Sequence, residues 1–574
     1  MTAGYAWVQT DIDQQLLTEL QSELGVSRPI ALALSRLGFS SETAQGFLSP
    51  SLSNLSNPFD LPGTEKAAER LWKAIDRHEK ILIHGDYDTD GITASVLLSS
   101  VLTENGADTE VFLPHRIDDG YGLTEESIEK ACSTDFSLLV TVDCGITSHD
   151  AVECARSRGL EVIITDHHEP CDTLPDALAV IDPKLPGAPE CVKELAGVGV
   201  AFKLCHAFLK LGRDNGLGGH QTDLKNYLDL VALGTVADIV PLLHENRCLV
   251  RYGLGVLSRQ QRPGIRALCD VAGLNGDVIR APDIAFRLAP RVNAPGRMGD
   301  ASLSMNLLLA QGMADAFAAA RTLDDANRAR QQLEQETADL AEKQLIERNF
   351  SPDWASIVVH GKDWHAGVLG IVAARLARSY NRPAVVLSLD SSDAYSGSVR
   401  SIPGINIIEV LDSVAHLLDR HGGHAMAAGL SLQPRHLQEF IEAFEHAVAR
   451  HFTEEHLKPQ LEICGIASIA EFDGQFFEQR DLLEPFGHSN PEPVFLCRDV
   501  RPDRLLPAGK THTRGALRDL SNRGIDFIAF GRTPDSFPPP PWDVVIKPQL
   551  NYYMGRCTPQ VEILDLRPAG IVTG

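Results

Sequence analysis

Features that mark membrane and secreted proteins are scarce in this chain. None of its apolar stretches approaches the roughly 18 residues that a membrane-spanning helix requires, and its first residues lack the basic start and apolar core of a signal peptide. The 11 cysteines are scattered, without Cys-x-x-Cys pairs or the density of a disulfide scaffold. We therefore expect a cytoplasmic protein with reduced thiols, no membrane association and no cysteine-based zinc site.

Positive charge is also in short supply. The 574 residues include 52 Lys and Arg against 77 Asp and Glu, for a net charge of −25. The deficit is uneven, because residues 480–574 hold 12 basic and 11 acidic side chains, so nearly all the negative charge lies earlier. This balance argues against loose coating of a duplex, which needs surplus Lys and Arg. It is compatible with a local basic channel and with acidic groups that bound cations offset.

Three short apolar runs end at acidic or histidine residues, at Ile81–Gly91, Leu138–Gly145 and Val162–His168. Their length and β-branched content predict buried strands of a parallel sheet, and ligands gather where such strands end. Gly234–Pro241, which contains Asp238, is a fourth candidate. We expect one crevice to hold a set of polar side chains from the first three runs: Asp86, Asp88, Asp90, Asp143, Asp166, His167 and His168.

Carboxylates that converge in one crevice would repel one another and raise one another's pKa values unless cations lay among them. Asp oxygens with imidazoles suit Mn²⁺ or Mg²⁺. Asp88 and Asp90 are two residues apart, so an extended segment would turn both to one side, with His84 within reach. In the alternative interpretation each Asp only caps the following helix, which explains one run better than four. Cys144 lies beside Asp143, and nearby carboxylates would raise its thiol pKa, which argues against a nucleophilic role.

The spacing of these segments can be compared with known families. The first motif is His84-Gly-Asp-Tyr-Asp-Thr-Asp-Gly91, and Val142-Asp-Cys-Gly145, Asp166-His-His168 and Gly234-Thr-Val-Ala-Asp238 follow it. The combination resembles the DHH phosphoesterase superfamily and, within it, the RecJ branch of single-strand-specific exonucleases. Further segments extend the resemblance over most of the chain: Asp119–Leu123, Leu195–Val200, Pro290–Arg297 and Gly422–Gly429.

The resemblance implies a site with two metal ions, Mn²⁺ or Mg²⁺, and Asp143 between them. The ligands that it implies are Asp88, Asp90, Asp143, His167 and Asp238. His84 and Asp86 would lie among these ligands or just behind them, and His168 would face the substrate phosphate. Asp143, Asp166 and His168 are thus the predicted catalytic residues.

Phosphate contacts are predicted from arginines and glycine-rich turns. The guanidinium binds phosphate through two parallel hydrogen bonds. Arg116, before a glycine turn, and Ser398 with Arg400, on one side of a strand, are predicted to bind the 5′ end, as the resemblance suggests. Gly423 and His424 belong to a predicted turn that would bring backbone amides near an anion. The candidates for internal phosphates are Arg291, Asn293 and Arg297.

Alternating strand-like and helix-like runs predict an α/β chain with two α/β lobes. A Pro-free run from Ala310 to Asn349 predicts a long helix that joins the lobes around a cleft, with a coiled coil as the alternative. We expect residues 1–65 to pack on the first lobe. The predicted domains are an N-terminal adapter (1–65), a DHH catalytic α/β domain (66–260), a helical region (261–350), a DHH-associated substrate-binding α/β domain (351–455) and an OB-like β-barrel (456–574) for nucleic acid. For the barrel, a purely structural role is the alternative.

The resemblance implies a single-stranded-DNA-specific 5′→3′ exonuclease that releases 5′-mononucleotides during DNA repair and recombination. Single-stranded DNA is then the main partner, a helicase and a single-strand-binding protein are further candidates, and we expect a monomer. The alternative enzyme is a DHH phosphoesterase for short oligonucleotides or cyclic dinucleotides, which needs neither the C-terminal β-domain nor so long a chain. A non-catalytic DNA-binding scaffold should have lost ligands, whereas all candidate positions are present here.

Overall fold

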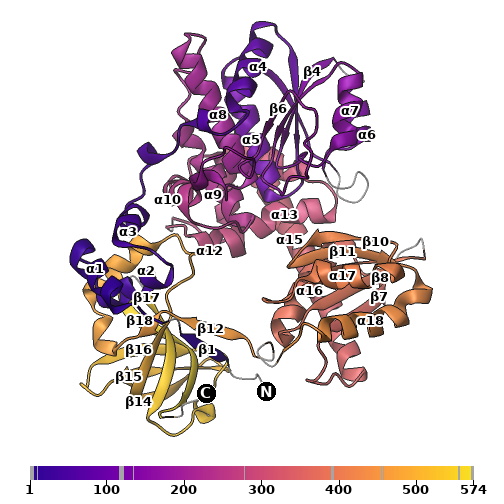
Figure 1. The fold of residues 1–574 in the computed structure, drawn as a ribbon. Coiled ribbons are helices and arrows are strands. Elements are labelled where there is room, and N and C mark those ends of the chain that lie inside the picture. Colours follow the sequence, from indigo (N-terminus) through magenta and orange to yellow (C-terminus); the bar gives the residue numbers. More distant parts are fainter. Residues whose placement is uncertain are drawn as a thin grey trace. The chain divides into compact units, whose positions relative to one another are not determined.

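The computed structural model describes residues 5–9, 11–114, 122–132, 135–276, 278–389, 393–453, 456, 458–553 and 556–570 (Figure 1). Internal contacts divide the chain into two compact units. One comprises Asp324–Leu461 with the first residues of the chain, and the other comprises Trp7–Leu323 with Glu462–Gly574. Within the described ranges, every helix is too short or too polar to cross a membrane.

A five-stranded sheet is the centre of Trp7–Leu323. Its strand order is β3–β2–β4–β5–β6, and every neighbouring pair is parallel. The three apolar runs that predicted strands are the neighbours β2, β4 and β5, which confirms that part of the prediction. The strands are β2 (Lys80–Gly85), β3 (Asp108–Phe112), β4 (Phe136–Val142), β5 (Glu161–Thr165) and β6 (Ala179–Ile181).

Helices cover both faces of this sheet (Figure 1). Ile81 and Ile83 of β2 pack into the larger core on one face, whereas Leu82 of the same strand packs into a smaller core on the other. Burial on both faces explains why these strands are almost continuously apolar. The larger core includes α4 (Thr64–Asp76), α5 (Thr89–Glu104) and α8 (Gly197–Asp214), and the smaller one includes α6 (Glu125–Cys132) and α7 (His149–Ser157).

Two local predictions at the strand ends were wrong. Asp88 and Asp90 do not lie on an extended segment, because α5 begins at Thr89, with Asp88 as its N-cap. Asp238 does not follow a strand but ends helix α9 (Leu228–Ala237). Residues 228–236 of this helix are all buried, so its apolar sequence lacks the 3.6-residue periodicity that distinguishes a surface helix from a buried strand.

The region after α9 is helical. The predicted long helix is confirmed as α15 (Met313–Glu347), which is 35 residues long. Ala316 and Leu323 near its start belong to the core around the parallel sheet, whereas Ala338 and Leu345 belong to a core of the other unit. The preceding helices are α10 (His244–Ser258), α11 (Pro263–Val271), α12 (Ala281–Asp283), the π-helix Ile284–Leu288, α13 (Ala289–Met298) and α14 (Ser302–Leu309).

Asp324–Leu461 contains a second five-stranded sheet with the order β10–β11–β9–β8–β7. Only β7 and β8 are parallel among these pairs. Gly423 and His424 were predicted in a turn but lie on the edge strand β10, where Gly423 pairs with Ala428 of β11. Pairing with β11 here overrides the weak strand preference of glycine. The elements are β7 (Ile357–Lys362), α16 (Ala366–Tyr380), β8 (Ala384–Leu389), β9 (Tyr395–Arg400), α17 (Ile407–Ser413), β10 (Arg420–His424), β11 (Ala427–Leu432) and α18 (Leu437–Ala449).

The C-terminal segment forms a β-barrel. Strands run in the order β14–β15–β16–β18–β17, and the additional pairing of β14 with β17 closes the sheet on itself. Closure leaves no long unpaired edge among the described barrel strands. The elements are β12 (Gln460–Ile463), β13 (Gly465–Ile466), α19 (Gly474–Arg480), β14 (Phe495–Ala508), β15 (His512–Arg518), β16 (Gly524–Ala529), β17 (Trp542–Tyr553) and β18 (Arg556–Pro568).

The N-terminal helices pack on the barrel, whereas we expected them to pack on the first lobe. Leu20 and Ile30 belong to the same core as Phe495 and Trp542 of the barrel. The prediction failed because an amphipathic helix shows which face is buried but not what covers that face. The elements are β1 (Ala6–Gln9), which pairs with β12, and α1 (Gln14–Leu24), α2 (Arg28–Arg36) and α3 (Ser41–Leu48).

Arg247 of α10 joins three parts of this unit. Its side chain is 1% exposed and donates hydrogen bonds to the carbonyl oxygens of Phe47 (2.9 Å), Leu483 (2.9 Å) and Leu482 (2.7 Å). The guanidinium also lies 3.6 Å from the centre of the Phe47 ring. One buried side chain therefore ties the helix that follows Asp238 to α3 and to the segment that leads into the barrel.

Candidate metal centre

Acidic and imidazole side chains gather at the carboxyl ends of β2, β4 and β5. Three overlapping groups have ligand atoms within 4.8 Å of one another. Asp143 and His167 are each shared by two of the groups, so the groups form one centre. The groups are Asp86, Asp88 and Asp143; Asp90, His167 and Asp238; and Asp143, His167 and His168. Six of the seven predicted metal-binding residues are therefore neighbours.

Backbone amides orient the two carboxylates at the start of α5. Oδ1 of Asp88 accepts hydrogen bonds from the amides of Asp90 (2.8 Å) and Gly91 (3.1 Å), as an N-cap does. The Asp90 carboxylate accepts from the amides of Gly197 (2.6 Å) and Val198 (3.0 Å), at the N-terminus of α8. A helix N-terminus favours negative charge. Asp88 is therefore both the N-cap of α5 and a member of a candidate ligand group.

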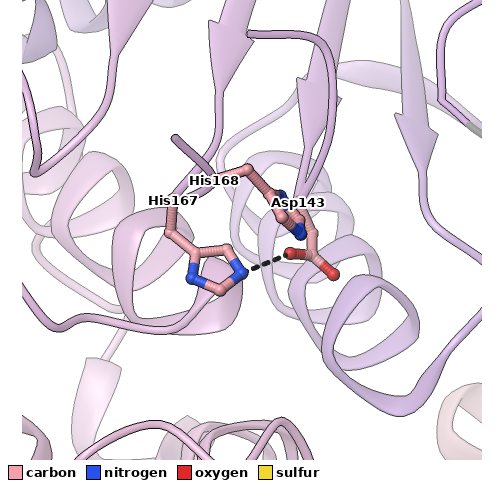
Figure 2. A group of neighbouring side chains, drawn as sticks. All are labelled: Asp143, His167 and His168. Atoms are coloured by element: carbon pink, nitrogen blue, oxygen red, sulfur yellow. Dashed lines mark ion pairs between the residues drawn. The ribbon is translucent and has the colours of Figure 1, made fainter. Parts of the chain in front are cut away.

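Asp143 lies at the middle of the centre. Its backbone has a φ of +62°, in the left-handed region, so the chain changes direction directly after β4. Oδ1 of Asp143 lies 3.1 Å from Nε2 of His167, as Figure 2 shows. Both atoms are buried, yet neither satisfies hydrogen-bond geometry. Buried polar atoms are normally hydrogen-bonded. A cation bound by Oδ1 of Asp143 and Nε2 of His167 would give both atoms a partner.

Glycines leave room around the centre. A Cβ atom on Gly197 would come within 2.5 Å of Oδ1 of Asp143, and one on Gly234 would come within 2.7 Å of Oδ1 of Asp90. Both distances are shorter than real non-bonded contacts of a Cβ atom. The backbones of α8 and α9 therefore approach the carboxylates as closely as glycine permits.

Burial and mutual repulsion raise the pKa values of three carboxyl groups of the centre. Burial, and then the charge of Asp88, raises the pKa of Asp90 to about 7. Burial, and then the charge of Asp90, raises the pKa of Asp238 to about 9, and the same causes raise that of Asp143 well above its ordinary value. Burial lowers the pKa of His167 to about 3, so its imidazole is neutral, the form that binds metals. The donor set fits divalent cations.

Asp166 holds His168 in place. Its Oδ1 accepts from Nδ1 of His168 at 2.7 Å, and its Oδ2 accepts from the amide of Ile146 at 2.9 Å. Burial opposes ionisation of Asp166, but these hydrogen bonds outweigh it and lower the pKa of the carboxyl group. Burial likewise opposes charge on His168, but the bond to Asp166 raises the pKa of that imidazole. The pair favours an imidazolium at the centre.

His84 lies near the end of β2, two residues before Asp86. It is fully buried, with Nε2 3.3 Å from Oγ of Ser127 and Nδ1 3.7 Å from Sγ of Cys144. Among the described residues, it belongs to none of the three groups. Burial, followed by the charges of Asp166 and Asp86, raises the pKa of the Cys144 thiol well above its ordinary value, as expected from the sequence. Cys144 is therefore a poor nucleophile.

Comparison with known proteins supports this architecture. Residues 80–235 match the family model described as DHH family, N-terminal domain; residues 354–450 match the DHHA1 domain; and residues 465–565 match the RecJ OB domain. The single-stranded-DNA-specific exonuclease RecJ of Haemophilus influenzae is 38% identical over 532 residues, which cover 91% of each chain. The Bacillus subtilis protein of that name is 35% identical over 562 residues, 96% of this chain and 70% of the relative.

The chain belongs to the RecJ family of single-stranded-DNA-specific exonucleases. A crystal structure of RecJ from Thermus thermophilus in complex with Mn²⁺ has a TM-score of 0.84 at 32% identity, covering 99% of this chain and 80% of that one. A structure of the Thermus protein with Mg²⁺ has a TM-score of 0.78 at 30% identity, covering 99% of this chain and 79% of that one. These matches confirm the predicted fold class, with two α/β lobes and a C-terminal OB barrel.

The predicted phosphate-binding residues of this RecJ family member are spread over both units. Arg116 lies outside the described residues. Ser398 and Arg400 lie on β9, and a Cβ on Gly370 of α16 would come within 3.4 Å of Oγ of Ser398 and 2.9 Å of Nη2 of Arg400. Both side chains therefore reach one side of the strand, as predicted. Arg291, Asn293 and Arg297 all lie on α13, and Gly423 and His424 lie on β10.

Sequence reasoning missed a buried carboxyl group at the end of β6 and one contact that supports the centre. Asp182, directly after β6, is fully buried, and its Oδ2 has no hydrogen-bond partner among the described residues; burial raises its pKa to about 7. The signal was available, since Val180 and Ile181 form another apolar run that ends in Asp. The second feature is the contact between Asn293 and Thr89, whose two hydrogen bonds join residues 204 positions apart. Residue spacing gives no signal for such a contact.

Proposed function

We propose that this chain hydrolyses single-stranded DNA from the 5′ end and releases 5′-mononucleotides, with two Mn²⁺ or Mg²⁺ ions. The observation that carries the proposal is the shared position of Asp143 and His167 in overlapping ligand groups, within a chain of RecJ architecture. Two neighbouring ions suit in-line displacement at phosphorus, because they stabilise both the attacking and the leaving oxygen.

Six residues would hold the ions. Asp86, Asp88 and Asp143 would serve one ion, and Asp90, His167 and Asp238 the other, with Asp143 adjoining both. In this proposal Asp86 is a ligand, whereas His84 is not a ligand and contacts Ser127 of α6. The five residues implied by the family resemblance are thus joined by Asp86 as a sixth.

The remaining residues of the centre act on the substrate. His168, which Asp166 holds through a 2.7 Å hydrogen bond, would present positive charge to a phosphate oxygen. Asp166 is then a positioning residue for His168. The amides of Gly197 and Val198 hold the Asp90 carboxylate and so fix the geometry in which that ligand acts. Pre-positioned ligands avoid reorganisation during the reaction.

Substrate length and polarity would come from contacts outside the centre. Arg116, Ser398 and Arg400 are proposed to bind the 5′ phosphate, and Arg291 and Arg297 of α13 are proposed to bind internal phosphates. For Asn293 we propose a different role, since its Oδ1 already accepts two hydrogen bonds from Thr89. The OB barrel is proposed to bind the strand further from the cut, a role for which this fold is suited.

One experiment tests metal, substrate and polarity together. Long single strands blocked at the 5′ end, at the 3′ end or at neither are incubated with Mn²⁺, and the products are resolved by length. We expect mononucleotides from the unblocked and 3′-blocked strands, no digestion of the 5′-blocked strand, and loss of all activity with EDTA or with Asp143→Asn. Preferential cleavage of a dinucleotide or a cyclic dinucleotide would favour the alternative DHH phosphoesterase.

We also propose that the protein acts as a cytoplasmic monomer in DNA repair and recombination, alongside a helicase and a single-strand-binding protein. The domain limits proposed for it remain those given above, at 65, 260, 350 and 455, with the N-terminal helices as part of the barrel core. Light scattering at micromolar concentration tests the monomer, and pull-down by the purified full-length chain tests the two partners.

A further inference from the structure

Ile239 has an unfavourable backbone conformation. It follows α9 with a φ of +63°, in the left-handed region. Twelve described non-glycine residues have a positive φ, and Ile239 is the only apolar one among them. Residues in this region are normally glycine or asparagine, and a β-branched side chain is a marked exception. The end of α9 would be formed with less strain by glycine.

Burial does not compensate for this strain. The Ile239 side chain is 69% exposed, whereas its neighbour Val240 is half-buried and packs on the main core. The exposed large apolar side chains of the described residues 66–260 are Leu174, Leu217, Ile239 and Tyr252, and Ile239 is the most exposed of them. Because the Ile239 side chain is strained and exposed to water, it should not stabilise the folded protein relative to glycine.

The position of Ile239 is next to the metal centre. Asp238, the residue before it, has Oδ2 3.6 Å from Nε2 of His167 and belongs to a ligand group with Asp90. Among the twelve positive-φ residues, Asp143 is the other one at this centre. Strained backbone clusters at functional sites, where an observed outlier is a reason to ask for a role.

We propose that Ile239 packs against the face of an unpaired nucleobase of the strand whose phosphate is held at the metal centre. The inference rests on the proposed function and adds a base contact to it. Aliphatic side chains contact base faces when they enter a base stack, and a strand without a partner exposes those faces. Because every base has such a face, the contact is tolerant of sequence.

The test compares two substitutions that each place glycine at a position where a larger residue has a left-handed backbone conformation. His78, with a φ of +53° and an exposed side chain, follows α4 and precedes β2, at the opposite end of the strand from the metal centre. Ile239→Gly and His78→Gly should both raise the melting temperature, because glycine relieves the strain. The two variants should differ only in their activity on DNA.

Activity is measured with Mn²⁺ on two 5′-phosphorylated oligonucleotides, one with normal bases and one with abasic residues at its 5′ end. On normal bases, Ile239→Gly should lower kcat/KM roughly tenfold, mainly through KM. On the abasic end it should match the wild-type protein. His78→Gly should match wild type on both, and titration calorimetry should give one Mn²⁺ affinity for all three proteins.

Three results would overturn the inference. The first is equal activity of Ile239→Gly and wild type on normal bases, and the second is an equal loss on both oligonucleotides. The third is a weaker Mn²⁺ affinity of Ile239→Gly, which would mean that Ile239 positions Asp238 and not a base. Failure of the wild-type protein to digest either oligonucleotide would instead overturn the proposed function, and this inference with it.

Discussion

Oδ1 of Asn293 accepts hydrogen bonds from both the amide and the hydroxyl of Thr89, at 2.8 Å each. Thr89 lies between Asp88 and Asp90, so one side chain of α13 holds the segment that carries two predicted metal ligands. A Cβ on Gly296, one turn further along α13, would come within 2.7 Å of the carbonyl oxygen of Tyr87. Helix α13 therefore packs directly on the loop between β2 and α5 and supports its conformation.

Asn293→Ala should weaken metal binding. The substitution leaves the Thr89 amide without its acceptor and frees the loop, and loss of such an outer contact typically costs 10- to 100-fold in metal affinity, so we expect about tenfold. Titration calorimetry with Mn²⁺ gives the affinity. Thr89→Ser keeps both donors and should bind Mn²⁺ like the wild-type protein. An unchanged Mn²⁺ affinity in Asn293→Ala would show that the loop does not need this support.

The metal-free protein should lose stability as the pH rises. Asp90 and Asp238 have folded pKa values raised to about 7 and about 9. Above about pH 4 the unfolded chain has released these protons while the native state retains them. Each such group then lowers the free energy of unfolding by up to about 1.4 kcal/mol per pH unit until the pH passes its folded pKa.

Urea denaturation between pH 5 and pH 8 measures this effect, once with EDTA and once with saturating Mn²⁺. The decline should be present with EDTA and largely absent with Mn²⁺, because the cation favours the ionised carboxylates. Asp238→Asn has one titrating group fewer and should show a shallower decline with EDTA. Metal-free stability that increases over this range would contradict the raised pKa values.

Cys144 should be chemically inert. Its thiol is 1% exposed and its pKa is raised well above the ordinary value, chiefly by burial. Native protein treated with iodoacetamide should be alkylated at the exposed Cys171 and not at Cys144, as measured by peptide mass spectrometry. Cys144→Ala should keep Mn²⁺-dependent nuclease activity within about threefold, since a small buried substitution perturbs packing only modestly. Loss of all hydrolysis in that variant would restore the thiol as a nucleophile.

Arg247→Ala should destabilise the unit that contains the barrel. Its removal leaves the carbonyl oxygens of Phe47, Leu482 and Leu483 without a buried donor, and we expect a loss of about 3 kcal/mol. Calorimetry should show a lower melting temperature. Arg259→Ala, at the exposed end of the same helix, is the matched control and should change stability by less than about 0.5 kcal/mol. Equal melting temperatures for the two variants would show that the hydrogen bonds of Arg247 do not stabilise this unit.

The sequence predicted the parallel sheet well because its strands are buried on both faces. Ile81, Leu82 and Ile83 alternate between two cores, so no polar residue interrupts the run, and a polar residue at its end stands out. An apolar run that ends in Asp also led to the wrong prediction of a strand before Asp238, because helix α9 is equally buried and therefore equally apolar. The Pro-free run before Asn349 located the long helix, and the family resemblance located the barrel. Nothing in the sequence of α1–α3 identified the surface that they cover.

The sequence predicted which residues form the centre, but not the backbone conformation that carries them or the contacts that orient them. The motifs identified Asp143 and His167, but the spacing of Asp88 and Asp90 suggested an extended segment where the structure has the first turn of a helix. The contacts that orient the ligands come from distant residues, such as the amide of Gly197 to Asp90 and Asn293 to Thr89. These depend on how α8 and α13 pack, which local sequence does not specify.

The centre should be sensitive to substitution of Gly197. Its missing side chain leaves the space in which Oδ1 of Asp143 lies, since a Cβ atom there would be 2.5 Å away. A single added carbon would displace a ligand from within, although alanine favours the helix that Gly197 begins. A Gly197→Ala allele should therefore produce a well-folded, abundant protein that has lost its catalysis. The inactive protein would compete with the normal protein for DNA, so the allele should be dominant-negative in a cell that carries both.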